Sequence, residues 1–311
     1  MKVYHSIETF DVQSPVAITI GTFDGVHLGH KEILNQLKEI AKQAKLPSVV
    51  LTFFPHPRMV LDQIQDVKML NTIEERIEIL SRCGIDHVIV YPFSKEFSQL
   101  TASEYIEGIL LEKIKAQKII IGYDHRFGKN REAGIETLLD FKKKYPALEV
   151  IEIPVQLLNS TAVSSTKTRQ ALQEGNVSLA NEFLGYAYML SGTVVQGKGI
   201  GKTLGYPTAN LHIAESYKLI PANGIYVVQC EIEGAKTFGM TSIGNNPTVG
   251  GTERTIETFF LDFAGDLYGK TLRIEFLEKI REEAKFDSIE SLQKAIHKDE
   301  IFARNYLKQY A

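Results

Sequence analysis

Two histidines behind a glycine-rich turn are the residues of the first half best suited to chemistry. His27 and His30 are three positions apart, so they share one face if the chain is helical there. The first turn of a helix offers unpaired backbone N–H groups and the positive end of the helix dipole. Imidazoles beside such donors form a pocket for phosphate oxygens. The turn in front of them consists of Gly21, Thr22, Phe23, Asp24 and Gly25.

Other roles for these residues remain open at this point. Two histidines at this spacing can be half of a metal site, and a single histidine at a helix start is commonly a surface or capping residue. No cysteine, and no acidic residue at the spacing of known metal motifs, stands near the pair. Gly21 and Gly25 let the backbone approach a ligand closely. Asp24 does not suit an anion pocket, and we expect it to cap the turn or to bond a hydroxyl.

The second half carries a glycine and lysine loop that fits neither common nucleotide motif. A P-loop that ended at Thr203 would need glycine at position 196, which is Gln196. Neither glycine frame completes G-x-G-x-x-G, because the third positions are Lys202 and Leu204. From the residues alone this is a flexible loop, and Glu257 on a later strand would ordinarily be a solvated side chain.

No serine, cysteine or lysine stands beside a base, so the sequence does not imply a covalent intermediate. Transfer of a phosphoryl or nucleotidyl group does not need one, because the protein can align the reactants and stabilise charge on the phosphate oxygens. His27, His30 and Arg169 suit that task.

The elements around the histidines alternate between strand and helix. An apolar run ends at Gly21, and helical spacing follows His30 up to Ala44. Capping boxes at 72–75 and 101–104 predict the starts of two further helices. Such alternation predicts a parallel sheet whose ligands bind at the carboxyl ends of the strands. The expected strands are 16–20, 48–54, 86–91, 118–122 and 148–155, and the expected helices after the first are 72–84, 102–115 and 134–145.

After Gly185 strands follow strands, which indicates an antiparallel barrel or sandwich. Helical signals at 167–172 and 177–183 come just before this change, so we place the domain boundary near 183–187. A capped helix from Asp287 runs nearly to the last residue. The expected strands are 188–196, 225–232, 236–243, 255–263 and 271–278.

Composition is that of an ordinary soluble globular protein. The chain has 311 residues, 44% hydrophobic and 23% charged, with a formal net charge of −3. No global field therefore favours nucleic acid or an anionic membrane. No signal peptide or membrane-spanning run is evident, and two distant cysteines fit reduced thiols, so we expect a cytoplasmic protein. The sequence leaves the oligomeric state open, a homo-oligomer included.

The string 21–30, G-T-F-D-G-V-H-L-G-H, resembles the HxGH signature of nucleotidyltransferases in the version found in prokaryotic FAD synthetases. Residues 121–131 resemble a second element of that family, which lines the ATP and flavin-phosphate site, with Asp124 in place and His125 where phenylalanine is usual. Residues 164–169 resemble its S-S-T-x-I-R element, with Thr168 in place of isoleucine. The resemblance implies a phosphate clamp from Ser164, Ser165, Thr166 and Arg169, and a weaker flavin contact from Phe54, Pro55 and His56.

Residues 197–210 resemble the G-x-G-x-G-x-x-L-G-x-P-T-A-N signature of riboflavin kinases. In that family the glycine loop covers the ATP phosphates, which implies this role for Gly197, Lys198, Gly199 and Gly201. The Thr and Asn of the signature reach Mg²⁺ and the phosphates, which implies Thr208 and Asn210 as metal ligands. By the same resemblance Glu257 is the catalytic glutamate and Arg281 lies near the flavin.

The two resemblances together cover nearly the whole chain. They imply an α/β Rossmann-like nucleotidyltransferase domain, 1–184, followed by an antiparallel β-barrel riboflavin kinase domain, 185–311, with a C-terminal helix. The expected enzyme uses ATP and Mg²⁺ to phosphorylate riboflavin to FMN and then to adenylylate FMN to FAD. Two alternatives are kept: an adenylyl- or cytidylyltransferase for another small phosphate, and a flavin-binding or sensor protein without turnover.

Overall fold

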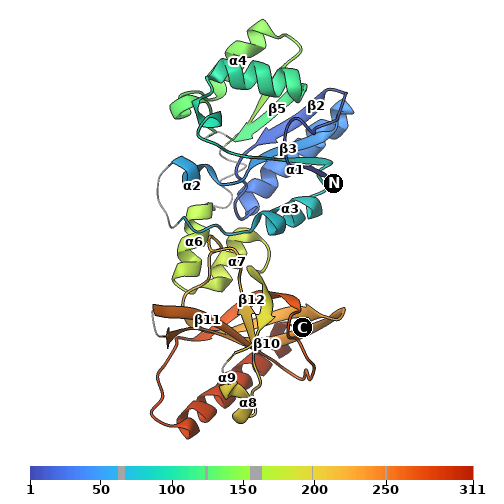
Figure 1. Ribbon diagram of the computed structural model, residues 1–311. Helices are drawn as coiled ribbons and strands as arrows, with labels where there is room; N and C mark the ends of the chain where they lie inside the picture. Colours follow the sequence, from blue (N-terminus) through green and yellow to red (C-terminus); the bar gives the residue numbers. More distant parts are fainter. Residues whose placement is uncertain (62–66, 123–124, 155–162, 198, 249–250, 311) are drawn as a thin grey trace. The chain divides into compact units, whose positions relative to one another are not determined.

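The chain forms two compact units, residues Met1–Ser165 and Thr166–Ala311 (Figure 1). The computed structural model describes residues 1–61, 67–122, 125–154, 163–197, 199–248 and 251–310. Helices α6 (Ser165–Gln173) and α7 (Val177–Leu184) lie mainly in the second of these compact units, and the domain boundary expected after residue 184 stays a prediction.

The first unit is built on a six-stranded, fully parallel sheet in the order β1-β4-β3-β2-β5-β6. The chain moves outward from β2 to β3 and β4, and then returns to place β5 on the other side of β2. The carboxyl ends of β2 and β5 are therefore the switch point at which sheets of this kind bind ligands. The strands are β1 (Lys2–Tyr4), β2 (Val16–Ile20), β3 (Ser48–Phe53), β4 (His87–Tyr91), β5 (Ala116–Gly122) and β6 (Glu149–Ile153).

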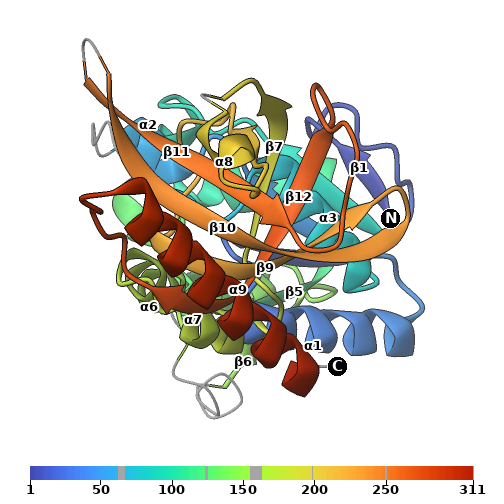
Figure 2. The same ribbon diagram turned by 90° about the horizontal axis from the view of Figure 1, so that it is seen from below.

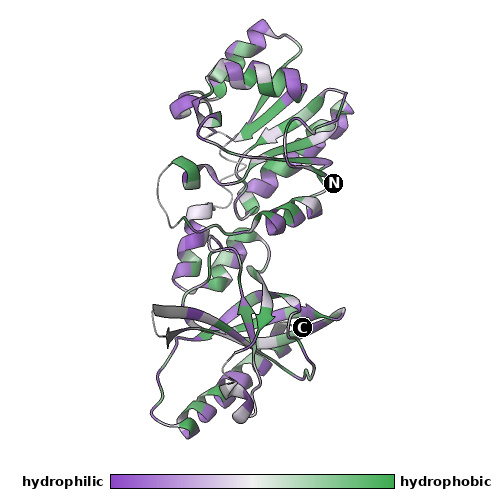
Figure 3. Ribbon diagram, in the orientation of Figure 1, coloured by the Kyte–Doolittle hydropathy of each residue, from purple (hydrophilic) through white to green (hydrophobic). Residues whose placement is uncertain are grey.

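Helices cover both faces of this sheet, as Figure 1 shows for α1 and α4. β2 and β3 are buried throughout and mostly apolar, which is typical of parallel strands (Figure 3). One core cluster joins Ile18 and Ile119 of the sheet to Leu110 and Leu138 of the helices. The helical segments are α1 (Leu28–Ala44), α2 (Pro57–Leu61), α3 (Ile73–Arg82), η1 (Phe97–Gln99), the π-helix η2 (Glu104–Lys113), η3 (Lys129–Arg131) and α4 (Ile135–Lys144).

The second unit is a closed antiparallel barrel in the order β10-β11-β8-β7-β12-β9. We predicted all of these strands except β8, which carries the end of the P-T-A-N motif. The short helix α8 (Ile200–Thr203) lies between β7 and β8 in the chain. The strands are β7 (Met189–Val195), β8 (Ala209–His212), β9 (Gly224–Ile232), β10 (Ala235–Thr248), β11 (Gly251–Phe260) and β12 (Thr271–Arg281).

Helices α7 and α9 (Ile289–Tyr310) pack on the outside of the barrel (Figure 2). The Ser178 hydroxyl donates to Glu278 at 2.9 Å, and the Asn181 amide donates to the Phe276 carbonyl at 2.8 Å, so α7 is hydrogen-bonded to β12. Apolar residues of α9, including the fully buried Ala303, pack against Val227 and Met240. The predicted C-terminal helix is confirmed.

No described helix combines the length and the apolar character that a membrane crossing requires.

Candidate active sites

The turn after β2 lies at the switch point of the parallel sheet. The Gly21 amide donates to the Leu51 carbonyl at 3.1 Å, which continues the ladder to the end of the strand. The chain then turns sharply, with φ values of 48° at Phe23, 84° at Gly25 and 36° at Val26, all in the region that favours glycine. This turn brings the start of α1 back over the strand ends.

His27 and His30 are stacked at that helix start. Their ring centroids are 3.7 Å apart and the planes meet at 16°. Nδ1 of His27 accepts the His30 backbone N–H at 3.3 Å, so His27 is the N-cap and α1 begins one residue later. A Cβ at Gly29 would lie 3.3 Å from the His27 ring, and the buried Phe23 ring lies 5.1 Å from His30. The prediction that His30 lies in the first turn of the helix is confirmed, and the buried ring of Phe23 packs against the His30 ring.

The buried His30 ring has a nitrogen atom with which a ligand could form a hydrogen bond. Its Nδ1 is buried and has no hydrogen-bond partner among the described residues. Burial, followed by the charges of His27 and Arg76, holds the pKa of His30 well below its usual range. The imidazole is therefore neutral at physiological pH, with one N–H to donate and one nitrogen to accept. A buried polar atom without a partner is costly, and a bound phosphate oxygen would remove that cost.

We expect acid to destabilise the protein through His30. An unfolded histidine takes up its proton near pH 6.5, whereas the folded chain resists protonation to lower pH. The unfolded state thus binds more protons in this window, and stability falls as the pH drops below about 6.5. The melting temperature, measured between pH 7.5 and 5, should fall less steeply with pH in His30→Gln than in the parent protein. A slope in His30→Gln equal to that of the parent would contradict the assignment.

Asp24 serves the architecture of the turn. Its carboxylate is 1% exposed and accepts the backbone N–H groups of Leu70, at 3.0 Å, and Asn71, at 3.3 Å. The fully buried guanidinium of Arg76 lies 4.0 Å away and donates to the Phe53 carbonyl. Asp24 thereby links the glycine turn to the start of α3 and the end of β3. A hydroxyl partner for Asp24 and a direct contact of its carboxylate with ATP both stay predictions.

Removing this carboxylate is expected to cost stability. Asp24→Ala removes the carboxylate that faces the buried Arg76 guanidinium and accepts two backbone N–H groups. Breaking such a buried pair typically costs about 3–5 kcal/mol. Urea denaturation of the full chain, followed by circular dichroism, measures the loss. Asp140→Ala removes an exposed ion pair with Lys143 and should change little, so equal stabilities for both variants would refute this role.

The other residues expected at this site differ in how far the structure describes their surroundings. His125 stacks on Phe127 with centroids 5.7 Å apart, so an aromatic face is retained where the family has phenylalanine. The Ser165 hydroxyl donates to the Asp24 carbonyl at 2.9 Å. Thr168 is fully buried, as suits a position that is usually isoleucine. Thr166 and Arg169 belong to the second unit, Ser164 is half-buried, and Asp124 lies outside the described residues.

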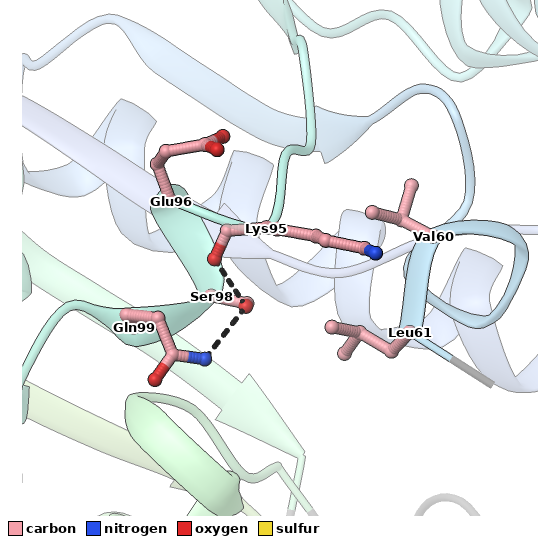
Figure 4. A pocket seen from close by; sticks show the side chains of 6 residues that line it. All are labelled: Val60, Leu61, Lys95, Glu96, Ser98 and Gln99. Atoms are coloured by element: carbon pink, nitrogen blue, oxygen red, sulfur yellow. Dashed lines mark hydrogen bonds between the residues drawn. The ribbon is translucent and has the colours of Figure 1, made fainter. Parts of the chain in front are cut away.

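The residues expected to contact the flavin follow directly after β3. His56 is buried, and its Nδ1 accepts the Arg58 backbone N–H at 3.1 Å; Phe54 is half-buried. A shallow hollow lies just beyond, between α2 and the segment around η1, with the Lys95 side chain extended toward two apolar side chains (Figure 4). No residue that we expected at the site lines it. Its lining residues are Val60, Leu61, Lys95, Glu96, Ser98 and Gln99.

The barrel brings its chemistry-bearing residues together by strand pairing. Glu257 on β11 stands directly opposite Asn210 on β8. The Thr208 hydroxyl, two residues before Asn210, donates to Oε2 of Glu257 at 3.1 Å. All three side chains are half-buried. The structure thus brings a carboxylate, an amide and a hydroxyl from two distant stretches of the sequence onto one patch.

The glycine loop lies tightly on this patch. A Cβ at Gly197 would come within 2.2 Å of Nδ2 of Asn210, and one at Gly201 within 2.3 Å of the Tyr206 carbonyl oxygen. Gly199, with φ 71°, is the N-cap of α8. A side chain at Gly201 would collide with the backbone of Tyr206, and one at Gly197 would push against the Asn210 side chain, so the loop is shaped to the motif that follows it. Lys198 lies outside the described residues.

Gly197→Ala should therefore displace the Asn210 amide. Misplacing a positioning group by about 1 Å can cost on the order of 10²-fold in rate, so we expect that loss in riboflavin phosphorylation. Formation of FAD from supplied FMN should be unchanged, because that reaction is assigned to the first unit. Gly108→Ala, where a Cβ meets nothing within 4 Å, is the matched control. Unimpaired phosphorylation in Gly197→Ala would show that the close approach has no role.

Arg281 is held by an acidic partner. Its guanidinium makes a two-pronged contact with Asp299 of α9, with Nε–Oδ1 at 2.9 Å and Nη2–Oδ2 at 2.7 Å. Nη1 donates to the Glu282 carbonyl. The arginine therefore joins β12 to the C-terminal helix, and the flavin contact expected for it stays a prediction.

Oxygen donors fit a hard divalent cation at the barrel patch. Thr208, Asn210 and Glu257 offer a hydroxyl, an amide oxygen and a carboxylate, which is the donor chemistry that Mg²⁺ prefers when phosphates supply further ligands. Around the histidine pair the described residues include no group of three His, Cys, Asp or Glu side chains able to hold a metal ion.

Two features of the sites were missed in the sequence. Arg76 appeared only as a residue of a capped helix, yet it is fully buried beside the glycine turn. A charged residue on the apolar face of an amphipathic helix was the available signal. Glu300 on α9 gave no signal, because its partner Tyr206 is 94 positions away.

Comparison with known proteins agrees with this geometry. Residues 9–167 match the family model described as FAD synthetase, and residues 184–307 match that of riboflavin kinase. The bifunctional riboflavin kinase/FMN adenylyltransferase of Listeria monocytogenes is 36% identical over 309 residues, 98% of this chain and 96% of that protein. Its namesake in Escherichia coli K12 is 34% identical over 295 residues, 94% and 93% of the two chains.

A solved structure has the same fold. The crystal structure described as a macrolide-efflux protein from Streptococcus pneumoniae superposes with a TM-score of 0.86 at 33% identity, over 97% of this chain and 98% of that one. That description differs from the names of the Listeria and Escherichia relatives.

The chain is thus a two-part enzyme of phosphoryl and nucleotidyl transfer. It belongs to the family of bifunctional riboflavin kinases/FMN adenylyltransferases, with the FAD synthetase part N-terminal and the riboflavin kinase part C-terminal.

Proposed function

We propose that the barrel patch phosphorylates riboflavin. The observation that carries this proposal is the meeting of Thr208, Asn210 and Glu257 under a glycine loop. Thr208 and Asn210 would hold Mg²⁺, which would neutralise charge on the ATP phosphates. Glu257 accepts the proton of the ribityl 5′-hydroxyl as that oxygen attacks the γ-phosphorus and ADP leaves. Position matters more than basicity in this transfer.

The switch point of the parallel sheet is proposed to adenylylate FMN. The phosphate of FMN attacks the α-phosphorus of ATP, and pyrophosphate leaves. His27 and His30 stabilise charge on the phosphoryl oxygens, supported by the unpartnered Nδ1 of His30 and by the N–H groups at the start of α1. Gly21, Thr22 and Gly25 allow close backbone approach. The contributions of Asp124, Ser164, Thr166 and Arg169 remain predictions from the resemblance.

Several finer assignments belong to the same proposal. The adenylyltransferase domain covers residues 1–184 and the kinase domain residues 185–311, and the cation is Mg²⁺. The protein works in the cytoplasm on ATP, riboflavin and FMN, without nucleic acid or membrane partners. A homo-oligomer is left open.

One assay tests the proposed function. The protein is incubated with riboflavin, ATP and Mg²⁺, and the flavins are separated by chromatography. We expect FMN to form first and FAD to follow with release of pyrophosphate. A flavin-binding or sensor protein would bind riboflavin without forming either product. A nucleotidyltransferase for another small phosphate would leave supplied FMN unchanged.

A further inference from the structure

The C-terminal helix reaches the kinase motif through one side-chain pair. The Tyr206 hydroxyl, in the G-Y-P-T-A-N segment, donates to Oε2 of Glu300 on α9 at 3.1 Å. The Gln293 amide, two turns earlier on α9, donates to the Leu204 carbonyl at 3.5 Å.

Glu300 is itself fixed. Arg304 donates from Nε to Oε1 of Glu300 at 2.9 Å and makes a two-pronged contact with Asp262, with both distances at 2.9 Å. The Arg281–Asp299 pair binds the same turn of α9 to β12. The ring of His297, which is largely exposed, lies 4.0 Å from Glu300 on the same helix. Glu300 is only 20% exposed, so it is a rigid acceptor.

Tyr206 in turn fixes the turn that carries the glycines. Its backbone N–H donates to the Gly201 carbonyl at 2.9 Å, and its own carbonyl occupies the space where a Gly201 side chain would stand. Its ring meets Phe259 edge to face at 5.1 Å, and Phe259 lies two residues beyond Glu257 on β11. The position of one phenol therefore sets the glycine turn relative to the strand that carries the carboxylate.

We propose that Glu300 is a positioning residue of the kinase site, which holds Tyr206 and thereby the segment 199–206 in the shape that covers ATP. The role is separate from the transfer itself, since among the described residues no hydrogen bond joins Glu300 to Thr208 or Asn210. This inference rests on the riboflavin kinase activity of the barrel. It predicts an effect on ATP use and none on FMN adenylylation.

Steady-state kinetics of the full chain test it. Tyr206→Phe removes only the hydroxyl, and Glu300→Ala removes its acceptor. Because the bond joins a hydroxyl to a charged carboxylate, each variant should raise the KM for ATP in riboflavin phosphorylation by about tenfold, with kcat nearly unchanged. Glu300→Gln keeps an acceptor oxygen and should recover part of the loss. The double variant Tyr206→Phe/Glu300→Ala should be no worse than the poorer single one.

Glu290→Ala, on an exposed position of α9, is the matched control and should keep the parent KM. A purely structural role for Glu300 would lower thermal stability and leave the KM for ATP unchanged, which would overturn the proposal. Additive effects in the double variant would also overturn it, because the two residues would then act separately. If the parent protein itself fails to phosphorylate riboflavin, the failure lies with the proposed function and not with this pair.

Discussion

Replacing Glu257 with glutamine is expected to lower the turnover of riboflavin phosphorylation by about 10²–10⁴-fold, the usual contribution of a general base. Glutamine has nearly the same shape and still offers an oxygen to the Thr208 hydroxyl, so the patch should stay folded. What it cannot do is take the proton from the attacking hydroxyl. FAD formation from supplied FMN should continue at the parent rate.

The measurement is initial FMN production from riboflavin, with FAD production from FMN as the internal control. Glu275 also lies on a barrel strand, but it pairs with Gln229 on β9 and not with the patch, so Glu275→Gln is the matched substitution. If Glu257→Gln phosphorylates riboflavin like the parent, the carboxylate is not the base. If it also loses FMN adenylylation while folded, the two reactions do not use separate sites.

The second large effect concerns the stacked imidazoles. We expect His27→Asn/His30→Gln to stop at FMN, with adenylylation lowered by about 10²–10³-fold or more, the cost of losing one charge-stabilising donor. Asparagine is a good N-cap, so it should replace the contact that His27 makes with the His30 backbone N–H. The helix start is then preserved while the imidazoles are lost.

Chromatography of a reaction with riboflavin and ATP would show this as accumulation of FMN. His5→Gln changes an exposed histidine of the same unit and should give FAD like the parent. FAD formation by the double variant at the parent rate would remove the imidazoles from the mechanism. A variant that makes no FMN, though folded, would point to one shared site.

Local pattern was enough to predict most of the fold. β2 and α1 lie where the apolar run and the helical spacing put them, and the capping box of Thr72 and Glu75 is formed in both directions. β8 was not predicted, because it is four residues long and its pairing partners, β7 and β11, decide its conformation. Helix η2 was predicted as α-helical, whereas it is a π-helix, a distinction that residue spacing does not carry.

The candidate sites were predicted less completely, because their support comes from distant residues. The sequence could pair His27 with His30, since three positions fix their geometry on a helix. It could not show that Asp24 faces the backbone of Leu70 and Asn71, or that Arg281 faces Asp299. Those contacts depend on how separate elements pack, and short polar motifs do not encode their partners.

The most direct test of two separate ATP-using sites is a mixing experiment. Glu257→Gln and His27→Asn/His30→Gln proteins are each given riboflavin, ATP and Mg²⁺, alone and together, and FAD is measured by chromatography. The account predicts little FAD from either variant alone and FAD at a rate near that of the parent from the mixture, because FMN made by one protein is used by the other. No FAD from the mixture, with both proteins folded and FMN accumulating, would contradict it.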